Sequence, residues 1–130
     1  MKSKTDDLRI INTQELVSPQ EIIDSISPSE RGFATIINAR NQIKNILNKS
    51  DNKFMIVVGP CSIHDVEAAK EYATRLKNLS SSLSGKCLVI MRVYFEKPRT
   101  VIGWKGLIND PDLDGSFKIN KGIKIARKLL

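Results

Sequence analysis

The chain has 130 residues and a mass of 14.6 kDa, which is enough for one ordinary domain and too little for two. Hydrophobic residues make up 41% and charged residues 27%, a balance that argues against wholesale disorder, and no apolar run approaches the ~18–20 residues of a membrane span. The net charge is +7, and residues 91–130 hold nine basic against four acidic side chains. An anion-binding surface is therefore expected in the last third of the chain.

The first 50 residues are predicted to form an N-terminal arm and a helical extension. Residues 1–17 are a short segment of mixed composition with one small apolar patch at Leu8, Ile10 and Ile11, as expected of an arm. Residues 18–21 (Ser-Pro-Gln-Glu) are typical of a helix start, and residues 27–30 (Ser-Pro-Ser-Glu) repeat the pattern. With Ser18 and Ser27 as caps, we expect a short helix and then a longer one that ends near Asn48. The apolar face of the longer helix is expected to include Phe33, Ile36, Ile37, Ile43, Ile46 and Leu47.

A β–α–β unit follows. Residues 54–58 and 87–93 are almost continuously apolar, as is typical of strands buried on both faces of a parallel sheet. Between them, Asp65 is expected to cap a helix that runs to about Leu83. The crossover predicts parallel strands, so Cys61 and Cys87 would lie at opposite ends of neighbouring strands as free thiols. The inward face of the helix is expected to hold Ala68, Ala69, Tyr72, Ala73, Leu76 and Leu79.

The last segment is predicted to be a loop of roughly twenty residues followed by a helix from near Ser116. Its lysines are expected to form a solvated face. Residues 110–115 (Asp-Pro-Asp-Leu-Asp-Gly) resemble the start of a calcium loop, but Lys118 and Lys121 occupy positions that need oxygen ligands. Two strands leave two open sheet edges, and the final helix has no stop signal. We therefore expect residues 51–130 to be the front of a larger α/β domain. The lysines of the solvated face are Lys118, Lys121, Lys124 and Lys128.

Two features that the sequence lacks suggest the cellular location. The N-terminus has no apolar core of a secretory signal, and two cysteines make no disulfide framework. A reducing cytoplasm is the expected location.

Chemistry-bearing side chains follow both strands. Ligands of parallel α/β folds bind at the carboxyl ends of the strands, so residues 59–65 and 92–100 should meet on one rim. Cys61 could be a small core residue or a metal thiolate. His64 has a ligand-like spacing from Cys61, but two ligands do not make a site, and a lone histidine is more often a cap or a hydrogen-bonding group.

Three cations accompany this rim. Arg92 ends an apolar strand, where an arginine could simply reach solvent. With Lys97 and Arg99 nearby it fits an anion clamp better, and Pro98 between them restricts the backbone. The anion could be a small phosphorylated substrate or the backbone of a nucleic acid, and charge alone does not separate the two.

At these motifs the sequence resembles the class I 3-deoxy-D-arabino-heptulosonate 7-phosphate (DAHP) synthases. The likeness rests on residues 59–65 (GPCSIHD), 91–100 (MRVYFEKPRT) and 103–111 (GWKGLINDP), and it covers nearly the whole chain. It implies the condensation of phosphoenolpyruvate with erythrose 4-phosphate, the first step of the shikimate pathway. It also implies a (β/α)₈ TIM barrel preceded by an N-terminal helical extension, with residues 1–50 as the extension and 51–130 as the first two barrel strands and helices.

The resemblance assigns roles residue by residue. Cys61 matches a ligand of a divalent metal ion, Mn or Fe, whose other ligands lie beyond residue 130. Arg92 matches a phosphoenolpyruvate-binding arginine, and Lys97 a lysine between the two substrates. The segment that holds erythrose 4-phosphate corresponds to Pro98, Arg99 and Thr100.

Regulation and assembly are implied in the same way. The resemblance favours the tryptophan-sensitive form, with the phenylalanine-sensitive form next, and places Asp6 and Asp7 near the inhibitor site of a neighbouring subunit. A homo-oligomer, either dimer or tetramer, is expected, with neither nucleic acid nor membrane as a partner. Residues 1–130 alone are expected to be inactive. The alternative is a small basic nucleic-acid-binding module formed by residues 91–128.

Overall fold

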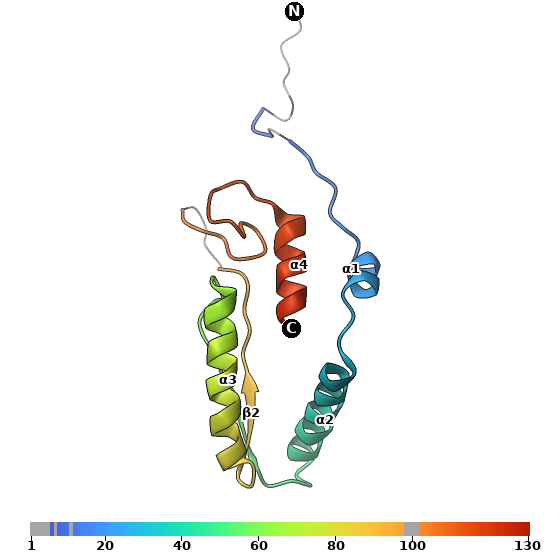
Figure 1. Cartoon of the computed structure of the whole chain (residues 1–130), viewed down its shortest axis with the longest axis vertical. Helices are drawn as coiled ribbons and strands as arrows, with labels where there is room; N and C mark the ends of the chain where they lie inside the picture. The colour runs from blue at the N-terminus through green and yellow to red at the C-terminus, as the bar shows by residue number, and fades with distance from the viewer. Residues whose placement is uncertain (1–5, 7, 11, 98–101) are drawn as a thin grey trace, which may run out of the picture.

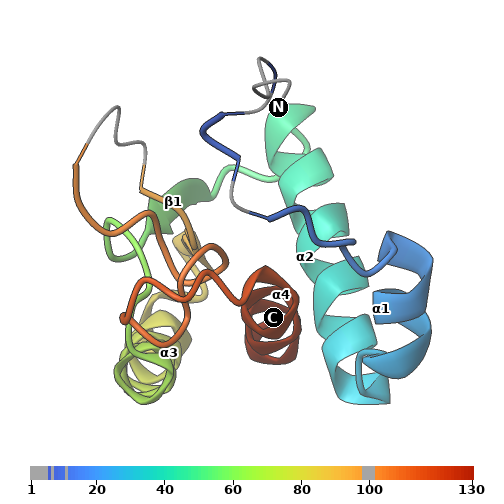
Figure 2. The ribbon, with the colours of Figure 1, turned by 90° about the horizontal axis from the view of Figure 1, so that it is seen from above.

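The computed structural model describes residues 6, 8–10, 12–97 and 102–130. The elements follow one another as helices α1 and α2, strand β1, helix α3, strand β2 and helix α4. In both Figure 1 and Figure 2, α4 lies between α3 on one side and the α1–α2 pair on the other. No helix in the described part of the chain is long and apolar enough to cross a membrane. The bounds are α1 Pro19–Ser25, α2 Glu30–Leu47, β1 Phe54–Val58, α3 Val66–Leu83, β2 Cys87–Met91 and α4 Ile119–Leu129.

The two strands form a parallel pair, as the β–α–β pattern predicts. Their register runs from Phe54 opposite Cys87 to Val58 opposite Met91. Strand β2 ends two residues earlier than expected, although the Arg92 amide still donates to the Val58 carbonyl at 2.8 Å. The pairing therefore carries Arg92 to the carboxyl end of the sheet.

Helix capping agrees with two of the three expected caps. The Ser18 hydroxyl accepts a hydrogen bond from the Glu21 amide, and the Asp65 carboxylate accepts from two amides at the start of α3. The third expected cap, Ser27, is wrong. Ser29 has extended backbone angles and caps α2 instead, so Pro28 stays outside the helix, while the Ser27 hydroxyl donates to the Ile23 carbonyl of α1.

Helix α4 begins at Ile119, three residues later than the sequence predicts. Phe117 has a φ of 50°, a left-handed conformation that cannot continue into a right-handed helix. The Ser116 amide is bound by the Asp114 carboxylate at 2.9 Å, which closes a turn just before the helix. A local turn thus overrides the helical pattern of the sequence.

The buried core lies at the carboxyl ends of the strands. Ile63, Ala69 and Leu107 form its centre, and the ring of Trp104 packs against them. Strand β1 was expected to be buried on both faces. Within the described residues its first four side chains are instead exposed, and Phe54 is 76% exposed. Parts of two expected apolar faces are exposed as well. The exposed residues are Phe33, Ile36, Ile37 and Leu47 on α2, and Ala68 and Leu79 on α3.

Candidate functional site

The segments that follow β1 and β2 meet in space, as predicted. The Ile63 amide donates to the Tyr94 carbonyl at 2.7 Å, which pairs the two segments beyond the end of the sheet. Gly59 makes this approach possible, because a Cβ at that position would lie 2.1 Å from the Arg92 carbonyl oxygen. The backbone itself therefore fixes the rim.

Arg92 folds back over this rim instead of extending into solvent. Its Nη1 donates to the Pro60 carbonyl at 2.9 Å and to the Cys61 carbonyl at 3.2 Å. Its Cζ lies 4.9 Å from the centroid of the Tyr94 ring. Within the described residues, all side-chain hydrogen bonds of Arg92 come from Nη1, so Nε and Nη2 are left to donate to a planar anion.

Cys61 is exposed at this rim, which is unlike a small residue of the core. Cys87 is half-buried at the other end of the sheet, opposite Phe54. The strand from Phe54 to Val58 alone spans about 13 Å, well above the ~7 Å limit between the Cα atoms of a disulfide. Both cysteines are free thiols.

The residues described here do not assemble a metal site by themselves. In residues 6, 8–10, 12–97 and 102–130, no group of three or more His, Cys, Asp or Glu side chains could hold a metal ion. Cys61 can offer one soft thiolate, whereas a bound ion needs several ligands. His64 is exposed, and its ring meets the Trp104 ring edge-on at 6.5 Å between centroids. The helix cap at this point is Asp65, not His64.

Lys97 is half-buried on the segment that follows β2. Its amide donates to the Lys105 carbonyl at 2.9 Å, and an antiparallel bridge joins Glu96 to Gly106. A Cβ on Gly106 would lie 2.2 Å from the Phe95 carbonyl oxygen, so this pairing requires glycine. The other site residues of this segment, Pro98, Arg99 and Thr100, lie outside the described residues, as does Asp7 of the arm; Asp6 is exposed.

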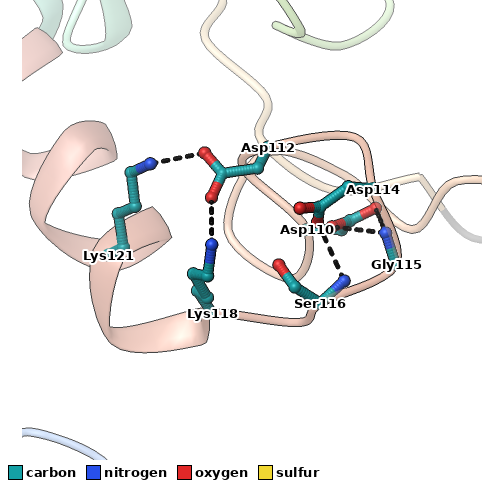
Figure 3. A network of polar contacts seen from close by, with 7 residues as sticks. All are labelled: Asp110, Asp112, Asp114, Gly115, Ser116, Lys118 and Lys121. Carbon is teal, nitrogen blue, oxygen red and sulfur yellow. Dashed lines mark hydrogen bonds and ion pairs between the residues drawn. The ribbon is translucent and has the colours of Figure 1, made fainter.

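The acidic loop before α4 is held by its own carboxylates (Figure 3). Asp110 is 6% exposed and accepts from the Gly115 amide at 3.1 Å. Asp112 accepts from Lys118 at 2.9 Å and also from Lys121. Lys118 and Lys121 are exposed, as expected of a solvated face, and through Asp112 both of them also tie this loop to the start of α4.

These contacts shift the pKa values of ionisable groups in and beside the loop. The hydrogen bond from Lys121, followed by that from Lys118, lowers the pKa of Asp112. The same pairing raises the pKa of Lys118. Hydrogen bonds from Ser116 lower the pKa of Asp114. All three groups are therefore held in their charged forms at neutral pH.

The sequence analysis missed two features. The first is the contact between Arg92 and Tyr94. Side chains alternate along an extended segment, so these two residues lie on the same face, and this spacing is the signal that could have predicted the contact. The other is the docking of the arm on α4. The Asn120 amide group accepts from the Val17 amide at 2.9 Å and donates to the Glu15 carbonyl at 3.0 Å.

Comparison with known proteins identifies the family. The profile of the DAHP synthetase I family matches residues 25–127. The chain belongs to this family. The predicted fold class is confirmed as well, since the structure of the phospho-2-dehydro-3-deoxyheptonate aldolase from Francisella tularensis SCHU S4 matches it with a TM-score of 0.86 at 50% identity. That match covers 92% of this chain and 35% of the solved one. The DAHP synthase fold is a TIM barrel, and the matched part of this chain corresponds to N-terminal helices followed by parallel β–α units of that fold.

Curated relatives agree on the family and differ in whether their names call them Phe-sensitive or Trp-sensitive. The Phe-sensitive phospho-2-dehydro-3-deoxyheptonate aldolase of Escherichia coli K12 is 52% identical over 130 residues, which is all of this chain and 37% of the relative. The Trp-sensitive aldolase of Escherichia coli O157:H7 is 50% identical over 129 residues, which is 98% of this chain and 37% of the relative. The chain thus spans little more than a third of the length of these relatives. The Phe-sensitive and Trp-sensitive relatives have similar sequence identity to this chain, with the Phe-sensitive one slightly higher.

Proposed function

We propose that this chain forms the N-terminal part of an enzyme that condenses phosphoenolpyruvate with erythrose 4-phosphate to DAHP and phosphate, the first step of the shikimate pathway. The observation that carries the proposal is the position of Arg92 on the strand-end rim. Its guanidinium is bound to the Pro60 and Cys61 carbonyls, and among the described residues two of its nitrogens have no hydrogen-bond partner and can donate to an anion. This position is the one where parallel α/β folds bind their ligands.

Each rim residue then has a role in the proposed reaction. Arg92 binds phosphoenolpyruvate, and Lys97 lies between the substrates and stabilises the charge that develops during carbon–carbon bond formation. The segment of Pro98, Arg99 and Thr100 holds erythrose 4-phosphate. Cys61 supplies one ligand of a divalent ion, Mn or Fe, and ligands outside residues 1–130 complete the set. Such an ion, when bound, supplies a Lewis acid for the aldehyde of erythrose 4-phosphate.

Regulation and assembly complete the proposal. The whole enzyme is a homo-oligomer, dimer or tetramer, inhibited by an aromatic amino acid, and Asp6 and Asp7 act near the inhibitor site. The resemblance of residues 5–9 and 101–115 to the tryptophan-sensitive form favours tryptophan as the inhibitor, although the Phe-sensitive relative has the slightly higher identity. Inhibition of the full-length protein by tryptophan at concentrations where phenylalanine has no effect would support this choice, and the reverse order would contradict it.

The organisation and compartment are proposed as well. Residues 1–50 act as an extension, and residues 51–130 provide the first two strands and helices of the barrel. The cytoplasm is the proposed location, in keeping with the free thiols of Cys61 and Cys87.

A basic nucleic-acid-binding module is the weaker alternative. Its case rests on the positive charge of residues 91–128. Lys118 and Lys121 both pair with Asp112, which reduces the charge available to a phosphate backbone.

A hybrid enzyme tests the proposed activity. Residues 1–130 replace the matching N-terminal part of the Phe-sensitive Escherichia coli K12 relative, whose own remainder supplies the rest of the barrel. We expect phosphoenolpyruvate consumption that requires both erythrose 4-phosphate and a divalent metal. The remainder alone and an Arg92→Ala hybrid serve as controls, and both should be nearly inactive. A hybrid that is folded by circular dichroism but forms no DAHP would contradict the proposal.

A further inference from the structure

The guanidinium of Arg92 is held from two directions. Its Nη1 donates to the carbonyls of Pro60 and Cys61, and the ring of Tyr94 lies beneath its Cζ at 4.9 Å. Both side chains are exposed, with 40% exposure at Tyr94, so surrounding side chains do not confine them. An exposed arginine with four flexible torsions samples many positions unless specific contacts select one.

The Tyr94 ring is well placed to make that selection. Cations are attracted to the face of an aromatic ring within about 6 Å of its centroid, and planar guanidinium groups also stack on it. The Tyr94 carbonyl is itself fixed by the Ile63 amide at 2.7 Å, which anchors the backbone beneath the ring. The backbone that carries the ring is therefore hydrogen-bonded to the segment after β1, which holds the ring face in place beneath Arg92.

This arrangement also ties the anion clamp to the thiol. Arg92 donates a hydrogen bond to the backbone carbonyl of Cys61, and the two segments approach each other closely at Gly59. A guanidinium released from the ring would lose its alignment relative to both the rim and the thiol. The donors that remain on Arg92 are useful for a planar anion only while their direction is fixed.

We propose that Tyr94 is a positioning residue for the phosphoenolpyruvate-binding arginine, acting through its ring and not through its hydroxyl. The inference rests on the proposed function of Arg92. Tyr94 keeps the guanidinium of Arg92 on the Pro60 and Cys61 carbonyls, with Nε and Nη2 directed away from them toward the substrate anion. It touches neither the substrate nor the metal.

The test compares two variants of the hybrid enzyme. Tyr94→Leu removes the ring face, and we expect the KM for phosphoenolpyruvate to rise about 2–5-fold, the range for an exposed cation–π contact. The kcat and the KM for erythrose 4-phosphate should change less than twofold, because the anion is bound equally in the ground state and the transition state. Tyr94→Phe keeps the ring, and its KM should stay within twofold of the parent.

A matched control separates positioning from general loss of structure. Phe33 is an aromatic residue on α2 with 60% exposure, and Phe33→Leu should leave both KM values unchanged. Melting temperatures of all variants should agree within about 2 °C, since neither ring is buried. An unchanged KM in Tyr94→Leu, or an equal rise in Tyr94→Phe, would overturn the inference while leaving the proposed function intact. A folded parent hybrid without turnover would overturn the proposed function, and this inference with it.

Discussion

At the scale of single residues, the basic side chains in the last third of the chain fall into two groups with different contacts. Arg92 lies on the rim, and Lys97 is held half-buried on the segment just beyond it, whereas Lys118 and Lys121 bind a carboxylate of the loop before α4. Charge counting over residues 91–130 could not tell them apart, because that difference depends on Asp112 being folded back against α4.

Replacing one lysine from each group should separate these roles. In the hybrid enzyme, Lys97→Ala should lower kcat/KM by about 10²–10³-fold, the cost of losing one group that stabilises developing charge. Lys118→Ala should change it less than twofold, because Lys121 still holds Asp112. Steady-state kinetics with both substrates measure the two effects. Equal losses would contradict the site assignment.

The loop carboxylate also predicts a pH dependence. The pKa of Asp112 is lowered in the folded chain, so its contribution is present above the unfolded pKa and is lost as pH falls through the folded value. We expect the melting temperature of the parent hybrid to exceed that of Asp112→Asn by a constant margin above about pH 5, and the margin to shrink below about pH 4. High salt should also reduce it, because the pairs are exposed. A margin that widens toward acid would contradict the ion-pair account.

At the scale of elements, the sequence predicted correctly those bounds and caps that are set by residues close together in the chain. β1 and α3 have their predicted bounds, and Ser18 and Asp65 cap as expected. The errors at Ser27 and at the start of α4 arise where two local signals compete. Ser29 offers a second cap two residues on, and the left-handed Phe117 ends the loop with a turn where helix was expected.

The docking of the arm could not be predicted, because its contacts join segments that lie about a hundred residues apart. Asn120 binds the backbone of residues 15 and 17, and Arg127 Nε donates to the Ile26 carbonyl at 3.1 Å. Ile22 of α1 is buried nearby, beside a cavity of about 380 Å³ that α4 also lines. An asparagine on a helix gives no signal in sequence of which distant backbone it will bind.

Removing that side chain should release the arm. In the hybrid enzyme, Asn120→Ala leaves the Val17 amide without its acceptor, and we expect its hydrogen exchange to become about five-fold faster, in line with the net value of one hydrogen bond. Asn78→Ala, an exposed asparagine on α3, is the matched control and should change nothing at Val17. Unchanged exchange in Asn120→Ala would show that the arm is held by other contacts.

At the scale of the whole molecule, the proposed function makes the described residues one side of a site that other parts of the enzyme complete. The core of the described residues is small and gathers at the carboxyl ends of the strands, while β1 exposes much of its apolar surface. The rim as a meeting place of two strand ends was predictable from parallel topology. The seating of Arg92 on backbone carbonyls was not, since it depends on the close approach at Gly59.

The central claim is that this chain supplies Arg92, Lys97 and Cys61 to a site that other residues complete. The most direct measurement is synthase turnover by residues 1–130, by the C-terminal remainder of the Escherichia coli K12 relative, and by the two pieces refolded together with manganese and both substrates. We predict no turnover from either piece alone, because the described residues assemble no metal site, and measurable turnover from the mixture. Turnover by residues 1–130 alone, or a folded complex of the two pieces without any, would contradict the account.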